Sequence, residues 1–210
     1  PVSFALDFED IPVGRCPRGF SVNGASGQAA IEVTDELART GQRCLRFRDQ
    51  KGLAKPFYPY LNRTGLRVPQ GPVEFAFDIR QDPAQPARLW IELRDYQTGG
   101  QAEYYPGPSV GVMANGKVMV GNVEVASIPA GAWARLALRF VLGTDQPKQW
   151  QLTVTLADGV VKTHTAPFLK DRFAVLTGLF LCADGDADGT AYVDNLALRV
   201  VEPAGAPPAQ

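Results

Sequence analysis

An alternation of apolar and polar residues with a period of two constrains this chain more than any other feature. From Pro72 to Arg80 every second residue is large and apolar, while the residues between them are small or charged. Similar patterns occur at Ala87 to Asp95, Arg43 to Asp49 and Arg135 to Phe140. Successive side chains of a β-strand point to opposite faces, so these segments are predicted to be half-buried strands.

Two dipeptides predict tight hairpins between further strands. Asn115-Gly116 separates two valine-rich segments, and Asp158-Gly159 separates residues 150–156 from Val160-Val161. Both dipeptides can adopt the positive φ angles of a hairpin turn. The only segment of helix-like composition, residues 35–39, is too short for more than one turn. We therefore predict an all-β fold without a long helix, a two-sheet antiparallel jelly-roll β-sandwich.

Length and composition predict one domain with a tail. A chain of 210 residues with 45% hydrophobic residues can bury one substantial core, which we place at residues 1–202. Residues 203–210 are rich in Pro and Ala and are predicted to be a linker that tethers the domain to further domains. Cys16, Cys44 and Cys182 have no metal-site spacing, so we interpret Cys44 and Cys182 as buried strand residues. One disulfide plus one free thiol remains an alternative.

The charge balance limits the partners of the chain. A formal net charge of -1 provides no positive field for nucleic acid or for an anionic membrane. The longest apolar run, residues 173–183, is shorter than the roughly 20 residues that cross a bilayer. We therefore predict that the chain binds neither nucleic acid nor a membrane. Fifteen arginines against six lysines favour an anionic sugar, because Arg pairs bidentately with carboxylate or sulfate.

Short segments carry a family resemblance. Asp7-Phe8-Glu9, residues 40–47 and residues 192–196 resemble the calcium-containing jelly-roll carbohydrate-binding modules of secreted bacterial polysaccharide-degrading enzymes. Residues 131–136 and 150–155 resemble strands of the wider concanavalin A-like lectin and glucanase group. The resemblance implies a non-catalytic module that binds a polysaccharide or oligosaccharide, in a secreted or cell-surface protein.

The same resemblance implies a structural calcium ion. In such modules an acid near the first strand and an aspartate in the last strand share calcium with backbone carbonyls. By this resemblance the predicted calcium ligands are Glu9, with Asp7 as an alternate, and Asp194, and residues 41–43 would supply the backbone carbonyls. Calcium takes six to eight oxygen ligands, so these groups suit it. The alternative is that the acids cap strand ends and accept hydrogen bonds from backbone amides.

A second acidic segment, residues 184–189, matches the opening of a calcium-binding hand loop. Its twelfth position is Asn195 instead of a glutamate, and no helices flank it. We predict a polar loop between two strands.

The polar face of two strands is the predicted ligand site. If residues 72–80 and 87–95 form neighbouring strands, six side chains share one outward face: Asp78, Arg80, Arg88, Trp90, Glu92 and Arg94. A Trp can stack on a sugar ring while charged groups bind its hydroxyls. Loop aromatics at residues 57–60, Tyr96 and residues 104–105 can line the same face. Alternatively, a loop half covers Trp90, and the charges form cross-strand ion pairs.

Catalysis is the alternative function. Residues 90–94 resemble a strand of alginate-lyase-like jelly rolls, in which Arg neutralises a substrate carboxylate and His or Tyr moves the proton. The single histidine, His164, lacks companion lyase motifs. Glucanases of the concanavalin A-like group need two carboxyl groups about 5 to 5.5 Å apart, and no strand here has acids at that spacing. The alternatives are therefore a glycoside hydrolase or polysaccharide lyase, and a structural or protein-interaction sandwich.

Overall fold

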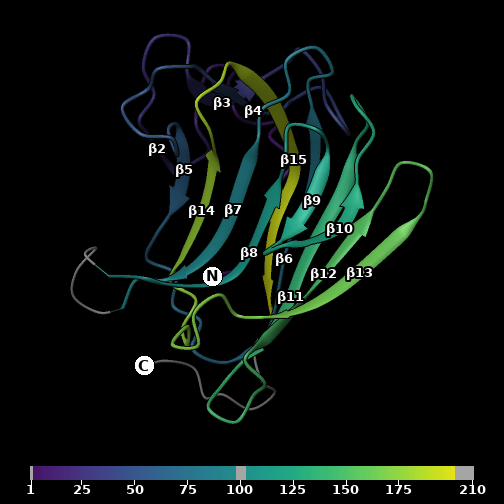
Figure 1. The fold of residues 1–210 in the computed structure, drawn as a ribbon. Helices are drawn as coiled ribbons and strands as arrows, with labels where there is room; N and C mark the ends of the chain where they lie inside the picture. The colour runs from purple at the N-terminus through teal and green to yellow at the C-terminus, as the bar shows by residue number, and fades with distance from the viewer. Residues whose placement is uncertain (1, 98–102, 202–210) are drawn as a thin grey trace.

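The computed structural model describes residues 2–97 and 103–201, in which fifteen strands and no helix are present (Figure 1). The strands are β1 (Phe4–Leu6), β2 (Ser21–Asn23), β3 (Ala30–Thr34), β4 (Cys44–Asp49), β5 (Tyr60–Arg63), β6 (Gly71–Gln81), β7 (Leu89–Asp95), β8 (Tyr105–Val112), β9 (Lys117–Val120), β10 (Val123–Ser127), β11 (Ala134–Leu142), β12 (Gln149–Thr155), β13 (Val161–Pro167), β14 (Gly178–Ala183) and β15 (Gly189–Val200). Within these described residues no helix is long and apolar enough to cross a membrane. The predicted linker, residues 203–210, lies outside the described residues.

The strands form two antiparallel sheets that pack face to face. One sheet has the order β13-β12-β11-β6-β15-β4-β3, with β1 paired to β15, and the other has the order β10-β9-β8-β7-β14-β5-β2. Figure 1 shows the seven-stranded sheet lying over the eight-stranded sheet. The structure confirms the predicted two-sheet sandwich.

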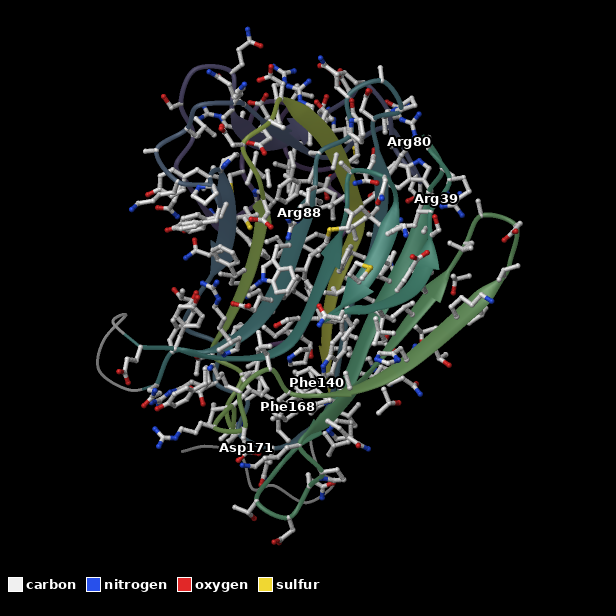
Figure 2. All side chains as sticks on the ribbon, in the orientation of Figure 1. Arg39, Arg80, Arg88, Phe140, Phe168 and Asp171 are labelled. Carbon is white, nitrogen blue, oxygen red and sulfur yellow. The ribbon has the colours of Figure 1, made fainter. Side chains whose placement is uncertain are left out.

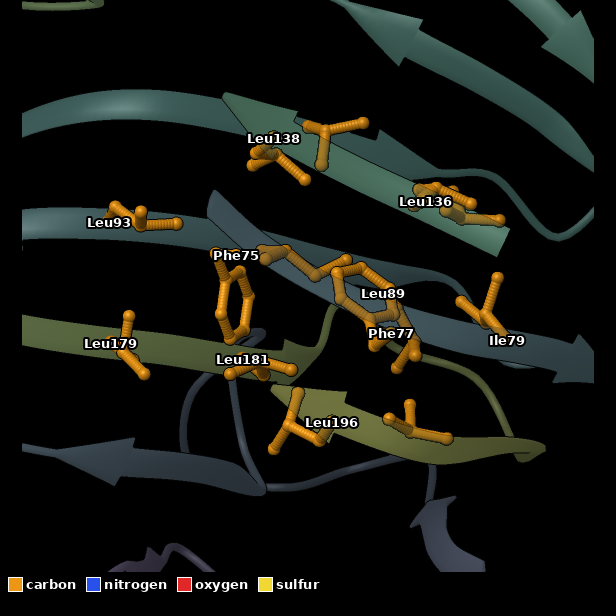
Figure 3. Packing of buried hydrophobic residues seen from close by; sticks show 14 of the residues in the cluster. Phe75, Phe77, Ile79, Leu89, Leu93, Leu136, Leu138, Leu179, Leu181 and Leu196 are labelled. Atoms are coloured by element: carbon orange, nitrogen blue, oxygen red, sulfur yellow. The ribbon is translucent and has the colours of Figure 1, made fainter. Parts of the chain in front are cut away.

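The core lies between the two sheets and follows from the period of two. Phe75 and Phe77 of β6 point inward toward the leucines of β7 and β14, and all of these side chains are fully buried (Figure 3). Burying one such side chain stabilises the fold by about 1.5–3 kcal/mol. The opposite residues of each strand are therefore free to build a site on an outer face.

Both predicted hairpins are present. At the β8–β9 turn the amide of Gly116 donates to the carbonyl of Met113 at 2.9 Å. Gly116 has a φ of 84°, and a Cβ there would lie 2.2 Å from the carbonyl oxygen of Ile128, so the turn requires glycine. Gly159 closes the β12–β13 turn by donating to the carbonyl of Leu156 at 3.0 Å.

The cysteines behave as small apolar strand residues. Cys44 on β4 and Cys182 on β14 are buried, and Cys16 is half-buried. All three are free thiols. The structure therefore confirms Cys44 and Cys182 as buried strand residues, although neither belongs to the core cluster between the sheets.

Candidate functional site

A groove of about 550 Å³ lies on the face of the seven-stranded sheet that points away from the core. Strands β2, β5, β7 and β14 supply most of its lining, and nearby loops supply the rest. The lining residues are Ser21, Asn23, Phe57, Tyr60, Asn62, Thr64, Trp90, Glu92, Arg94, Tyr96, Tyr104, Phe180, Cys182 and Asp184.

Strand alternation places the central side chains. On β7 the odd-numbered Leu and Ile residues fill the core, so Trp90, Glu92 and Arg94 point into the groove. On β14 the leucines likewise take the core side and leave Phe180 and Cys182 on the groove side. The register pairs Glu92 with Phe180 and Trp90 with Cys182, so the two strands present their groove residues side by side.

A buried ion pair occupies the floor of the groove. Arg94 Nε donates to Glu92 Oε1 at 2.7 Å, and only 10% and 7% of the two side chains are exposed. Glu92 Oε2 also accepts a hydrogen bond from Trp90 Nε1 at 3.1 Å. Burial alone would lower the pKa of Arg94, but the charge of Glu92 together with the charge of Tyr96 and the hydrogen bonds to both residues outweighs it, and the pKa is raised above its ordinary value. Arg94 is therefore a fixed cation.

Aromatic rings enclose the guanidinium of Arg94. Its central carbon lies 3.6 Å from the ring centroid of Phe180 and 4.0 Å from that of Tyr104. Both contacts are within cation–π range. Arg94 Nη1 donates to the hydroxyl of Tyr96 at 3.3 Å. A guanidinium has five donors, so Arg94 retains hydrogen-bonding capacity for an anionic ligand.

Glycines let the aromatic rings lie close to the sheet. Gly178 is paired with Arg94, and a Cβ at Gly178 would lie 2.3 Å from the ring of Tyr96. Gly111 is paired with Trp90, and a Cβ there would lie 3.2 Å from the indole. Gly178 must remain glycine for the ring of Tyr96 to keep its place, whereas a Cβ at Gly111 would displace the flexible end of Met113, 2.6 Å away, and require only a small shift of the indole.

A row of aromatic side chains extends from the ion pair to one end of the groove. Phe180 lies 5.0 Å from Tyr60, and Tyr60 lies 6.2 Å from Phe57, measured between ring centroids. Phe57 is 41% exposed. Burial raises the pKa of the Tyr60 hydroxyl, which therefore keeps its proton at neutral pH.

Two further groups of the groove, the Asp184 carboxylate and the Cys182 thiol, are not free to react. Asp184 pairs with Arg88 at 3.0 Å. Burial raises the pKa of the Cys182 thiol, so a nucleophilic thiolate is not available there. Both carboxylates of the groove, Glu92 and Asp184, are thus held by arginines.

The structure brings together four of the six predicted ligand residues and separates two. Trp90, Glu92 and Arg94 line the groove, and Arg88 lies immediately before β7. The assignment of Asp78 and Arg80 to the same face is corrected. Their strand, β6, belongs to the eight-stranded sheet, and Figure 2 shows Arg80 apart from Arg88.

Asp78 and Arg80 lie apart from the groove because of the sheet topology, and their side chains have other partners. Consecutive strands β6 and β7 cross from one sheet to the other instead of forming a hairpin. Asp78 accepts a hydrogen bond from Asn195 Nδ2 at 2.8 Å, and Arg80 Nε donates to the carbonyl of Gly131 at 2.6 Å. His164 is also away from the groove, on β13 at an edge of the eight-stranded sheet.

The predicted metal ligands have amide partners in this structure. Asp194 Oδ2 accepts from the amides of Arg39 and Thr40 at 2.8 and 3.1 Å. Glu9 Oε1 accepts from the amides of residues 42 and 43 at 2.9 and 2.8 Å, and Asp7 Oδ1 accepts from the amide of Glu9.

These backbone amides are the partners that the amide-capping alternative predicted for the acids. An N–H group cannot bind a cation, which needs oxygen ligands such as carbonyl groups at these positions, so the arrangement does not fit calcium. In residues 2–97 and 103–201 no group of three or more His, Cys, Asp or Glu side chains is placed to hold a metal. Calcium stays a prediction from the resemblance alone.

Residues 184–188 of the acidic segment form a polar loop between β14 and β15, as predicted, and Gly189 begins β15. Asp186 Oδ1 accepts from the amide of Gly52 at 2.7 Å, and Asp188 Oδ1 accepts from the amide of Lys51 at 3.0 Å. The two acids fix this loop to the turn after β4.

Comparisons of sequence find no matching family model and no matching curated protein. Comparison of structure finds an endo-β-1,4-glucuronan lyase from the fungus Trichoderma reesei, with a TM-score of 0.66 and 13% identity over 94% of this chain and 95% of that one. A cellulose-induced protein has a TM-score of 0.60 and 14% identity over 93% and 96% of the two chains. A marine PL-14 alginate lyase from Aplysia kurodai has a TM-score of 0.56 and 10% identity over 81% and 87%.

The likeness is one of fold. It supports the concanavalin A-like jelly roll and does not extend to the sequence. It also contradicts the prediction of a non-catalytic carbohydrate-binding module, because polysaccharide lyases share this architecture over most of the chain. The enzyme alternative is the better supported of the two.

Several groove residues were missed in the sequence. Phe180 and Cys182 lie in the apolar run 173–183, where both faces of β14 are apolar and the alternation is hidden. Asn62 and Thr64 were missed as well, and their alternation with Leu61 and Arg63 was the available signal for β5. Tyr60, Phe57, Tyr96 and Tyr104 do line the groove, as the sequence suggested for the loop aromatics.

Proposed function

We propose that this chain is a polysaccharide lyase that cleaves an acidic polysaccharide by β-elimination. The observation that carries the proposal is Arg94, a charged guanidinium fixed by Glu92 and enclosed by Phe180 and Tyr104 within the groove. Elimination removes a proton from the carbon next to a uronate carboxylate. A preorganised cation that pairs with this carboxylate stabilises the charge that develops.

Tyrosines are the proton-transfer groups that the groove offers. Tyr96 accepts a hydrogen bond from Arg94 and would take the proton from the carbon beside the bound carboxylate as its phenolate, after its own proton has passed to solvent. Tyr60, which also lines the groove and keeps its proton, would give that proton to the leaving glycosidic oxygen. One C–H bond and one C–O bond break, a C=C bond forms, and the leaving oxygen gains the proton of Tyr60. Tyr96 ends protonated and Tyr60 deprotonated, and proton exchange with solvent restores both groups.

Hydrolysis is less well supported by the same groove. A retaining glycosidase needs one carboxyl group as acid and a second as nucleophile, about 5 to 5.5 Å apart. The two carboxylates of the groove are each engaged by an arginine, Glu92 by Arg94 and Asp184 by Arg88. Elimination requires neither carboxylate to be free.

The aromatic row supports a polysaccharide as the substrate. The exposed ring of Phe57 and the partly exposed ring of Tyr60 offer faces on which successive sugar rings can stack, and the buried Phe180 continues the row to Arg94. Two of the three fold neighbours named above are described as lyases, of glucuronan and of alginate, both acidic polysaccharides, which is consistent with a carboxylate at Arg94.

The test is a substrate panel of glucuronan, alginate and a neutral glucan, with the ultraviolet absorbance of the new C=C bond as the readout. We expect absorbance to rise with at least one acidic polysaccharide and not with the glucan. New reducing ends without absorbance would indicate hydrolysis and overturn the proposal, as would a lack of cleavage across a broad panel of polyuronates.

A further inference from the structure

A second cavity adjoins the groove at Tyr104. It has a volume of about 530 Å³ and is lined by Glu103, Tyr104, Tyr105, Lys170, Asp171 and Arg172. Tyr104 lines both cavities and is 39% exposed. A chain bound in the groove beyond Arg94 would therefore pass the side chains of this second cavity.

The loop that carries Lys170 and Arg172 is held firmly against the sandwich. Phe168 and Phe173 are buried, and their rings lie 4.9 Å apart between centroids. Figure 2 shows Phe168 beside Phe140, with Asp171 farther out along the loop. The amide of Lys170 donates to the carbonyl of Pro106 at 2.8 Å.

The end of the same loop is fixed to β7. Asp95 Oδ2 accepts hydrogen bonds from the amides of Ala174 and Val175 at 3.3 and 3.1 Å. With both ends fixed, the two cations keep their backbone positions before a ligand arrives, which lowers the entropic cost of binding.

The second cavity has an excess of one positive charge that the groove lacks. Its lining holds Lys170, Arg172, Glu103 and Asp171, and Lys148 from outside the lining balances Asp171. In the groove Arg94 and Arg88 are balanced by Glu92 and Asp184. In the second cavity Asp171 is paired with Lys148 at 3.4 Å. Lys170 forms no ion pair within residues 2–97 and 103–201, and Arg172 Nη1 donates to the neutral hydroxyl of Tyr105 at 3.2 Å.

We propose that Lys170 and Arg172 form a second anion-binding subsite, which holds the charged group of a sugar unit next to the unit bound at Arg94. This inference rests on the proposed function and narrows it, because it requires a polysaccharide with acidic groups on neighbouring units. A carboxylate and a sulfate share the chemistry that Lys and Arg recognise, and the substrates of the test separate them.

The test compares the double variant Lys170→Ala/Arg172→Ala with the wild-type chain. The matched control is Lys162→Ala/Arg199→Ala, which removes two exposed cations on the other sheet. We expect the subsite variant to raise KM for a polyuronate about five- to tenfold with kcat nearly unchanged, whereas the control retains the wild-type KM. Added salt should reduce the difference.

A binding measurement without turnover separates this inference from the proposed function. Affinity electrophoresis in gels of polyuronate, sulfated galactan or neutral glucan needs no catalysis. Weaker retardation of the subsite variant by polyuronate would support the subsite even if no elimination is found. If the subsite variant is retarded less than the wild-type chain only in gels of sulfated galactan, the subsite binds sulfate, and the carboxylate assignment is overturned.

Two results would overturn the subsite while leaving the lyase proposal in place. One is elimination by the wild-type chain with equal KM values for the subsite variant and the control. The other is a loss of retardation of the subsite variant that is as large in neutral glucan as in polyuronate, which would show that the effect does not depend on charge.

Discussion

Arg94 Nε and Glu92 Oε1 are joined by a 2.7 Å hydrogen bond between residues two positions apart on β7. Both side chains point into the groove because residues two apart on a strand share a face. The carboxylate is occupied by this bond and by Trp90 Nε1, so it orients the guanidinium and is not a free acid. Removing one partner of such a buried pair costs about 3–5 kcal/mol, because the other charge is left uncompensated.

The role of Arg94 is tested best by Arg94→Lys. Lysine keeps the positive charge opposite Glu92 but lacks the planar fork that holds a carboxylate and a neighbouring tyrosine together. We expect kcat on an acidic polysaccharide to fall about 100-fold or more, with a smaller loss of stability than for Arg94→Ala. Steady-state kinetics and urea unfolding measure the two effects. Wild-type activity in Arg94→Lys would exclude a specific role for the guanidinium.

Trp90 is predicted to bind substrate and not to hold the core together. Its indole is half-buried on the groove side of β7, while the residues on either side of it fill the core. Trp90→Ala should raise KM by an amount equivalent to about 2 kcal/mol and change kcat less. The free energy of unfolding is the control. A loss of about 3 kcal/mol or more, as for a core aromatic, would mean that the indole is structural.

Asp49 should make stability depend on pH. Burial, with the charges of Asp184, Asp188 and Asp186, raises the pKa of Asp49 from 3.8 to about 6. Between these values the folded chain binds more protons at this group than the unfolded chain, so its contribution to stability falls as pH rises through the window.

The matched variant for this effect is Asp49→Asn, which has no charge to bury. At neutral pH we expect it to be more stable than the wild-type chain by about 1–3 kcal/mol, with the difference disappearing toward pH 3.8. Urea unfolding at several pH values measures this. A difference that is constant across the window would show that Asp49 does not titrate there.

Asp194 should stabilise the fold through amides and independently of calcium. It is fully buried and accepts hydrogen bonds from the amides of Arg39, Thr40 and Asn195. Asp194→Asn replaces one acceptor oxygen with a donor and should cost about 1–3 kcal/mol, equally in excess calcium and in excess chelator. A wild-type melting temperature that rises with calcium, and a rise that Asp194→Asn abolishes, would instead support the calcium predicted from the resemblance.

The fold followed from the sequence where one face of a strand is apolar and the other polar. β6, β7 and β11 alternate clearly, and the Asn115-Gly116 and Asp158-Gly159 turns are where the dipeptides predicted them. The sheet to which each strand belongs did not follow, because alternation assigns a face and not a neighbour. This is why Asp78 and Arg80 were grouped with Trp90.

The centre of the groove and the aromatic residues Phe57, Tyr60, Tyr96 and Tyr104 were visible in the sequence, and the rest of its surroundings were not. Trp90, Glu92 and Arg94 stand out because polar residues interrupt an apolar strand. Phe180 reaches Arg94 from β14 only through the sheet register, and Lys170 and Arg172 reach Tyr104 from a loop more than sixty residues away. Contacts at such sequence separation are set by the tertiary fold, which local patterns do not encode.

The mass of the products tests the central claim most directly. Hydrolysis adds one water to each cleaved bond, whereas elimination adds none and leaves an unsaturated sugar at the new non-reducing end. Wild-type chain incubated with glucuronan or alginate should release oligosaccharides lighter by one water than hydrolysis products, and Arg94→Lys should release far fewer. Products that carry the added water, at rates that Arg94→Lys leaves unchanged, would contradict the lyase mechanism and the role of Arg94.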